Sequence, residues 1–217
     1  MFIVLDWLDG SGKGTQTKLV SEALLAMWKK VLVLDYPRYG ESSCYFVEKY
    51  LNGAYGEVNA EAASIFYALD RFEDSFHFKE RQKDYDYIIS NRYVSANMMH
   101  HGGKINNKKK RIKFMKWLYK LEYKIFWIPK PDLILFLDVP PEISQKLVEQ
   151  KSSRDYIKDG KNKDLHEADE HHLTKAYKVA HEILEEFSDW KRVKCTKDRA
   201  MLPEEVITQK ILSHIIS

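Results

Sequence analysis

Short apolar segments recur along the chain, and each ends in a polar or turn residue. Nearly continuous apolar runs are typical of strands that are buried on both faces, as in parallel sheets. Because patterns with helical spacing lie between these runs, the sequence predicts an α/β fold built on a parallel sheet. The predicted strands cover residues 2–5, 31–34, 87–89, 133–137 and, more weakly, 192–195.

The segments between the strands carry apolar residues at helical intervals. After the first strand, Leu19, Val20, Ala23, Leu24 and Met27 are spaced three, four and seven residues apart, which predicts a helix with one buried face. The predicted helices cover residues 15–30, 42–51, 60–82, 110–127, 141–150, 165–187 and 203–216.

Composition is that of an ordinary globular protein. The chain has 217 residues, of which 44% are hydrophobic and 31% charged, enough for one α/β domain with a sizeable core. A net charge of +3 gives no argument for nucleic-acid or membrane binding. Cys44 and Cys195 lack the spacing of a zinc site or a disulfide framework, and no stretch has the length of a signal-peptide core or a membrane span. We therefore expect one cytoplasmic domain, residues 1–217.

The sequence DGSGKGTQ at residues 9–16 lies between the first strand and the first helix. Glycines in this position let backbone N–H groups turn toward phosphate oxygens, the helix N-terminus favours an anion, and Lys13 can reach the β and γ phosphates. The full motif would have glycine at Trp7 and a hydroxyl at Gly14, and here the hydroxyl moves to Thr15. The pattern predicts phosphate binding.

Several stretches together resemble the thymidylate kinases, a family of nucleoside monophosphate kinases. The resemblance runs to about residue 180 and implies transfer of the γ-phosphoryl group of ATP to dTMP, with magnesium and usually as a homodimer. It also implies a three-layer P-loop kinase fold, with a five-stranded parallel sheet flanked by helices and a short lid. The matching stretches are LDGSGKGTQ at residues 8–16, YPRYG at 36–40, ALDR at 68–71, NRYVSAN at 91–97, PKPD at 129–132 and DLHEAD at 164–169.

The resemblance assigns the donor side of the site to the phosphate loop. Lys13 would hold the ATP phosphates and act in catalysis. Asp9 would hold the sugar 3′-hydroxyl or a magnesium-bound water, which places it in both the catalytic and the dTMP-binding sets. The backbone amides that would contribute to ATP binding are those of Gly10, Ser11, Gly12, Lys13, Gly14 and Thr15.

On the acceptor side, Arg38 and Arg92 would clamp the phosphate of dTMP, with Arg92 also catalytic. A guanidinium group suits this task because it binds phosphate oxygens through two parallel hydrogen bonds and stays charged. Tyr36 belongs to the same motif as Arg38 and is assigned to the dTMP site. The alternative for each arginine is a surface salt bridge.

For the base, Tyr67 and Arg71 are four residues apart and share one helix face, which sets an aromatic ring beside a planar donor. The resemblance implies stacking on thymine and a hydrogen bond to its O4. Phe66 precedes Tyr67, so either ring could stack, although the helical phase favours Tyr67.

Three further residues are assigned to the dTMP site. Asn97 resembles the residue that meets the N3 edge of the pyrimidine. His100 stands near the sugar 2′ position, where the family commonly has tyrosine. Tyr177 is expected to pack nearby.

The polar segment at residues 151–164 is expected to form a mobile lid, with an ordinary solvated loop as the alternative. Its Arg154 is the candidate for stabilising charge on the transferred group, because the phosphate loop carries no arginine. Asp164 and Glu167 share a helix face and resemble acids that close over magnesium or the sugar. Together with the Thr15 hydroxyl they are the candidate metal ligands.

Two other functions stay open. Asn91, where the family usually has aspartate, and Trp7 together suggest a nucleotide-binding protein with weak or lost turnover; a kinase for another deoxynucleoside monophosphate is a second possibility. Residues 104–120 carry eight basic residues and no acid, which could bind nucleic acid. An amphipathic helix with Ile112, Met115 and Leu118 packed inward is the favoured interpretation.

Overall fold

The computed structural model describes residues 1–7, 10–147 and 170–216, and its centre is a parallel five-stranded sheet with strand order β2-β3-β1-β4-β5. In the sheet register, Asn91 of β3 lies between Leu5 of β1 and Asp35 of β2, so these three strands end at the same edge. The strands are β1 Phe2–Asp6, β2 Val31–Asp35, β3 Tyr87–Asn91, β4 Leu133–Asp138 and β5 Trp190–Lys194.

Burial explains which strands have a strong sequence signal. Every residue of β1 and β4 is buried, because these strands lie inside the sheet and are covered on both faces. The edge strands β2 and β5 include exposed positions, and β5 accordingly has the weakest apolar run. All five predicted strands are confirmed.

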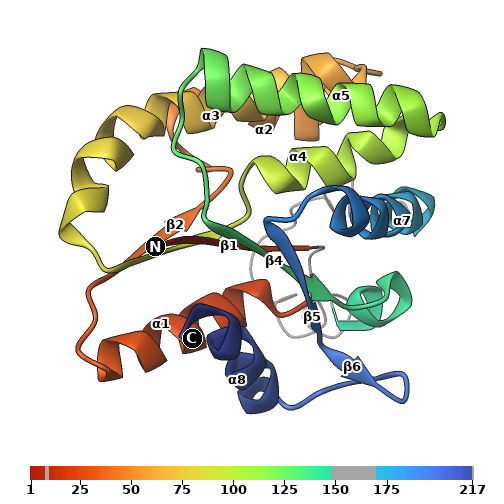
Figure 1. Ribbon diagram of the computed structural model, residues 1–217. Coiled ribbons are helices and arrows are strands. Elements are labelled where there is room, and N and C mark those ends of the chain that lie inside the picture. Colours follow the sequence, from red (N-terminus) through yellow and green to blue (C-terminus); the bar gives the residue numbers. More distant parts are fainter. Residues whose placement is uncertain (8–9, 148–169, 217) are drawn as a thin grey trace, which may run out of the picture.

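Helices cover both faces of the sheet and complete three layers (Figure 1). Helices α1 and α8 pack together on one face, and α4, α5 and α7 lie on the other, with α3 beside them. The longer helices are α1 Lys13–Ala26, α3 Ala60–Arg81, α5 Lys108–Lys120, α7 Glu170–Glu186 and α8 Glu204–Ile215. Shorter ones are α2 Tyr45–Leu51, α4 Val94–His100, the 3₁₀ turns Ser42–Cys44, Gln82–Asp84 and Gly102–Lys104, the π-helix Leu121–Ile125 and the helical residues 141–147.

Some predicted details are wrong. Helix α1 ends at Ala26, and Met27, expected on its buried face, is 48% exposed beyond that end. The helix predicted at 110–127 is regular only to Lys120 and continues as a π-helix. Helix α4 was not predicted because its residues are nearly all buried, which removes the alternation that marks a surface helix. A hairpin of two-residue strands, β6 Thr196–Lys197 and β7 Ala200–Met201, was also missed.

Apolar side chains of both helical layers and the sheet form one buried cluster that runs from Phe2 to Ile215. Among the described residues, no helix combines the length and the apolar content that a membrane crossing requires. The predicted lid, residues 151–164, lies outside the described residues.

Candidate nucleotide site

The candidate site lies at the carboxyl edge of β1, β2 and β3, the edge where open α/β sheets bind their ligands. Gly10 and Gly12 have φ angles of 77° and 85°, in the left-handed region that glycine adopts without strain. Gly12 ends the loop with no side-chain cap, and the first turn of α1 carries no acidic residue. The N–H groups of that turn therefore suit an anion.

Two side chains of the loop are buried beneath this turn. Lys13 is 5% exposed and Ser11 is 1% exposed. The Ser11 Oγ has no hydrogen-bond partner among the described residues. Thr15 lies half-buried in the first turn. The structure thus places the predicted ATP-binding residues from Gly10 to Thr15 at one helix N-terminus.

Trp7, which replaces the first glycine of the motif, points away from the loop and into the core. Its indole Nε1 donates a hydrogen bond of 2.6 Å to the Val139 carbonyl, and its ring packs edge-on against Phe136. Tyr177 lies against the same indole, and its hydroxyl donates to Asp138. Trp7 therefore fixes the start of the loop against β4. Tyr177 belongs to the same cluster, and its assignment to the dTMP site stays a prediction.

Asp6 is a buried carboxylate that the sequence reasoning missed. It ends β1, accepts hydrogen bonds from the Trp7 N–H at 2.8 Å and from the Ser95 hydroxyl, and lies in the electrostatic field of Arg92 and Lys13. Burial raises its pKa above the ordinary value of a carboxyl, although both cations act in the opposite direction. An acid that ends an otherwise apolar strand was the signal that could have revealed it.

Arg92 is held at the same point from β3. Its backbone N–H donates to the Leu5 carbonyl at 3.0 Å, and its own carbonyl accepts from the Ser90 hydroxyl at 2.6 Å. Its φ angle of 64° is uncommon for a residue other than glycine and is typical of functional sites. Arg92 and Lys13 both lie in the electrostatic field of Asp6, and their contact with phosphates stays a prediction.

Arg38 is surrounded by acids of α3. Its Nε contacts Asp70 at 3.0 Å, its Nη1 contacts Asp74 at 3.1 Å, and its Nη2 contacts Glu73. The Tyr36 hydroxyl donates to the same Asp74. The loop after β2 is thus fastened to α3, and the role of Arg38 as a phosphate clamp stays a prediction.

The two candidate rings for base stacking have different neighbours. Phe66 stacks on Phe46 of α2, with centroids 5.9 Å apart. Tyr67 instead packs against His101, at 5.4 Å, just beyond the end of α4. Arg71 follows Tyr67 by one turn of α3, and its guanidinium lies over the Tyr93 ring, 5.9 Å from the ring centre.

Arg71 is buried and paired with Glu122. Its Nε and Nη2 contact the two carboxylate oxygens at 2.6 and 2.7 Å, and both side chains are at most 2% exposed. Glu122 lies in the π-helix, an irregularity that is frequent at functional sites. The pair leaves Nη1, which is 3.5 Å from the Tyr93 carbonyl, as the part of the guanidinium least occupied by protein.

Asn97 and His100 both lie on α4. The Asn97 side-chain amide donates to the Ser64 carbonyl at 3.1 Å and joins α4 to α3, while the His100 ring stacks on His172 at 5.6 Å. Asp9, Arg154, Asp164 and Glu167 lie outside the described residues. Within the described part of the chain, no three His, Cys, Asp or Glu side chains form a group that could hold a metal ion.

The basic segment forms the amphipathic helix α5, with Met115 and Leu118 buried as expected. Of the eight basic residues between 104 and 120, Arg111 is buried and pairs with Glu182. Lys104 lies in the turn before the helix, and its Nζ donates to the Tyr50 hydroxyl at 2.6 Å. The other six are exposed on the helix.

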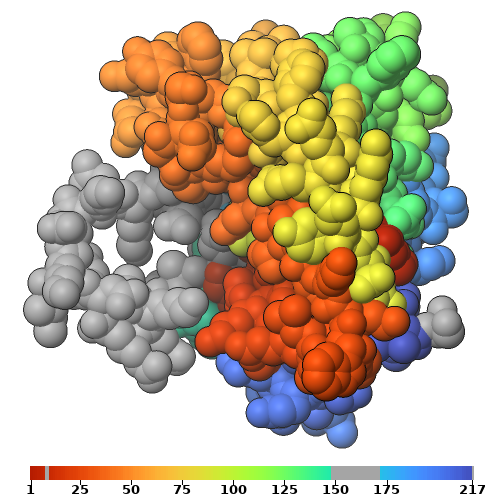
Figure 2. Space-filling model, turned by 90° about the vertical axis from the view of Figure 1, so that its left-hand side faces the viewer, coloured from red at the N-terminus to blue at the C-terminus, as the bar shows by residue number. Residues whose placement is uncertain are grey.

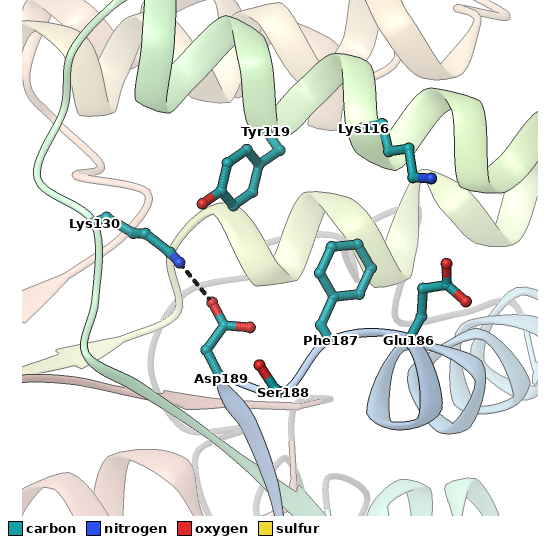
Figure 3. A pocket seen from close by; sticks show the side chains of 7 residues that line it. All are labelled: Lys116, Tyr119, Lys130, Glu186, Phe187, Ser188 and Asp189. Carbon is teal, nitrogen blue, oxygen red and sulfur yellow. Dashed lines mark ion pairs between the residues drawn. The ribbon is translucent and has the colours of Figure 1, made fainter.

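A hollow of about 470 Å³ lies beside the end of α5, near the amino ends of β4 and β5 and opposite the phosphate loop (Figure 3). Lys130 and Asp189 in its wall form an ion pair of 3.1 Å. Acidic and basic side chains are balanced there, which does not suit a nucleotide polyphosphate.

Comparison with known proteins gives a consistent result. The family model described as thymidylate kinase matches residues 5–206. A thymidylate kinase of Mycobacterium tuberculosis is 28% identical over 172 residues, which cover 78% of each chain. A probable thymidylate kinase of Methanocaldococcus jannaschii is 28% identical over 178 residues, covering 80% of this chain and 84% of the relative.

Among solved structures, thymidylate kinase from Candida albicans aligns with a TM-score of 0.75. The alignment covers 99% of this chain and 90% of that one at 19% identity. At this identity the likeness shows the fold, and it agrees with the three layers seen here.

The buried Arg71–Glu122 pair predicts a large stability effect. Glu122→Gln leaves the Arg71 charge uncompensated inside the protein, so the free energy of unfolding should fall by about 3–5 kcal/mol in urea titrations followed by circular dichroism. The matched control is Glu22→Gln, whose partner Lys18 lies 3.9 Å away in a pair that is more than half exposed. That change should cost less than about 1 kcal/mol. Equal losses in the two variants would contradict the prediction.

The raised pKa of Asp6 predicts a specific pH dependence of stability. The folded state binds the Asp6 proton more tightly than the unfolded state, so Asp6 favours folding at low pH and this contribution is lost as pH rises through the folded-state pKa. Asp6→Asn mimics the neutral acid, so the variant does not lose this stability as pH rises. The stability of the variant relative to the wild type should therefore increase between about pH 4 and pH 8. Urea unfolding across this range measures the difference, and a constant or falling difference would refute the assignment.

Proposed function

The chain belongs to the thymidylate kinase family, and we propose that it transfers the γ-phosphoryl group of ATP to dTMP, giving dTDP and ADP. The observation that carries the proposal is the phosphate loop at the carboxyl edge of the sheet, with Lys13, Arg92 and Asp6 brought together there. The family match spans this loop and the helices α3 and α4, which carry the predicted acceptor site.

The reaction needs alignment and charge neutralisation more than proton removal. The acceptor oxygen belongs to a phosphate whose second pKa is about 6, so it is ionised at neutral pH. Lys13 and the amides of the first turn of α1 hold the donor phosphates, and Arg92 approaches the acceptor phosphate from the end of β3. Asp6 lies in the electrostatic field of both cations. Arg38 binds the acceptor phosphate when some of its hydrogen bonds to the acids of α3 are replaced by hydrogen bonds to the phosphate oxygens.

Selectivity for dTMP follows from the base site. Tyr67 stacks on thymine, and Nη1 of Arg71 donates to its O4. Glu122 holds the guanidinium plane in place, so the donor is oriented before the base arrives. Asn97 and His100 lie on α4, where they meet the pyrimidine edge and the sugar.

Magnesium accompanies ATP in this proposal, and when bound it neutralises charge on the β and γ phosphates. The chain fits it: Asn91 Oδ1 and Thr17 Oγ1 are buried oxygens without a hydrogen-bond partner among the described residues, and they lie beside Gly14. Asp9, Asp164 and Glu167 are proposed to contribute further oxygens, with Thr15 as the hydroxyl at the loop. Arg154 is proposed to stabilise charge on the transferred group.

The chain is also proposed to work as a single-domain homodimer in the cytoplasm. Ile65, Leu69, Phe72 and Phe76 repeat at heptad-like spacing on α3, and Ile65 and Phe76 are 37% and 58% exposed. Helix α2 packs beside α3 (Figure 2), and its Tyr45 and Phe46 are 54% and 44% exposed. An exposed apolar stripe of this kind suits a second copy of the chain. The two cysteines are buried free thiols, which suits a reducing compartment.

Acceptor preference tests the proposed reaction. ADP production is measured with ATP and a panel of nucleoside monophosphates, and dTMP should be the fastest acceptor. Lys13→Ala should lower kcat by at least about 100-fold, because it removes the charge at the transferred phosphoryl group. The control Lys18→Ala changes an exposed lysine of the same helix and should leave kcat unchanged. Nucleotide binding without turnover would favour the rival binding protein, and equal rates for all acceptors would refute the dTMP assignment.

The homodimer is tested by charge insertion on α3. Phe76→Glu should shift the molar mass in light scattering from that of a dimer to that of a monomer, because the apolar contact would bury a carboxylate. Trp28→Glu is the control, since Trp28 is 95% exposed at the end of α1, away from the stripe. A monomeric wild type, or a dimer in both variants, would contradict this interface.

A further inference from the structure

Two positions of the phosphate site lack the groups that P-loop enzymes use to hold magnesium. In these enzymes the ion is held by a hydroxyl directly after the loop lysine and by an aspartate at a neighbouring strand end. Here Gly14 follows Lys13, and the residue that ends β3 is Asn91. Neither residue provides a hydroxyl or a negative charge.

The space beside these two residues is open. A Cβ atom added at Gly14 would meet no heavy atom within 4 Å. A pocket of about 380 Å³ begins there and is lined by Gly14, Thr17, Asp35 and Asn91, together with residues farther along α1 and β2. There is room for a hydrated ion at the side of the phosphate loop.

The pocket contains a carboxylate that the sequence reasoning did not single out. Asp35 ends β2 and stands beside Asn91 in the sheet register. The Asn91 Nδ2 donates a hydrogen bond of 2.8 Å to the Asp35 Oδ1. The contact fixes the orientation of the asparagine amide. The carboxylate of Asp35 thus ends β2, whereas P-loop enzymes have the aspartate at the position of Asn91, the end of β3.

Two neutral oxygens lie in the same pocket without a partner. Asn91 Oδ1 is buried and accepts no hydrogen bond from the described residues, while the hydrogen bond of Nδ2 to Asp35 fixes the direction in which this oxygen faces. Thr17 is 6% exposed, lines the pocket, and its Oγ1 likewise has no partner in the described part of the chain. Buried polar atoms without partners are uncommon and point to a ligand or a bound water.

We propose that Asp35, with Asn91 Oδ1 and Thr17 Oγ1, holds the hydrated magnesium ion that accompanies ATP. The inference rests on the proposed function, because ATP supplies the ion's phosphate ligands. Magnesium keeps several of its waters, so a carboxylate one strand farther away holds it through water. Asp35 thus provides the charge that Asn91 lacks, and Thr17, one turn after Gly14 on the same helix face, provides a hydroxyl in addition to that of Thr15.

The test measures metal binding directly. Mn²⁺ replaces Mg²⁺, and electron paramagnetic resonance follows free Mn²⁺ in titrations of the protein with a non-hydrolysable ATP analogue. Asp35→Asn should weaken Mn²⁺ binding by about tenfold or more, the effect of losing a partner that acts at a bound metal. Binding of the analogue without metal, measured by calorimetry, should stay within about twofold.

Glu22→Gln is the matched control. Glu22 lines the same pocket but lies eight residues beyond Gly14, about 12 Å along the helix. Its removal should leave Mn²⁺ affinity within about twofold of the wild type. A second variant, Gly14→Ser in the Asp35→Asn background, should recover part of the lost affinity, because it restores the hydroxyl of the usual site.

The outcomes separate the inference from the proposed function. Unchanged Mn²⁺ affinity in Asp35→Asn, or an equal loss in Glu22→Gln, would overturn the inference even if ADP forms from ATP and dTMP. A wild type that binds Mn²⁺ with the analogue through Asp35 but phosphorylates no acceptor would overturn the proposed function and leave the inference standing. Thermal melts of the variants confirm that each is folded.

Discussion

The candidate site is organised around a buried carboxyl group at the end of the central strand. Asp6 is fully buried, yet it is held by the Trp7 N–H and the Ser95 hydroxyl and lies in the field of Lys13 and Arg92. An ionised carboxylate inside a protein is costly unless hydrogen bonds and opposite charges compensate it. The compensation is partial, because burial still raises the pKa of Asp6. The Ser95 hydroxyl joins the end of β1 to α4, and the Arg92 N–H joins it to the end of β3 through the Leu5 carbonyl.

Carboxylates also organise the acceptor side. Glu122 holds Arg71 in a buried pair, and the acids of α3 hold Arg38 on the loop after β2. The two arrangements differ in consequence. A buried, doubly hydrogen-bonded guanidinium has a fixed plane, which suits recognition of a flat base. The Arg38 guanidinium, which is 19% exposed among several acids, can exchange partners, which suits a phosphate that enters and leaves.

The departures from the phosphate-loop motif are compensated elsewhere in the fold. Trp7 replaces a glycine, but its ring lies in the core and its indole bonds to the Val139 carbonyl. Gly14 and Asn91 remove a hydroxyl and a charge, and the pocket beside them contains Asp35 and Thr17. The substitutions that raised the possibility of lost turnover therefore leave a loop with its glycine turns and helix N-terminus in place. Residues distant in sequence can replace the missing groups because the ends of neighbouring strands lie at the same edge of the sheet.

The sequence alone determined the class of the fold, its five strands, the phosphate loop and the resemblance to one enzyme family. These features are local. An apolar run, a helical spacing or a contiguous glycine motif can be identified from neighbouring residues alone, without knowledge of the tertiary structure. Tertiary structure alone decided which polar and charged side chains meet. Asp6 and Arg92, Arg71 and Glu122, and Asp35 and Asn91 are each separated by 51 to 86 positions along the chain, and no spacing rule links them. Strand order and helix packing bring them together, because a parallel sheet places distant strand ends side by side.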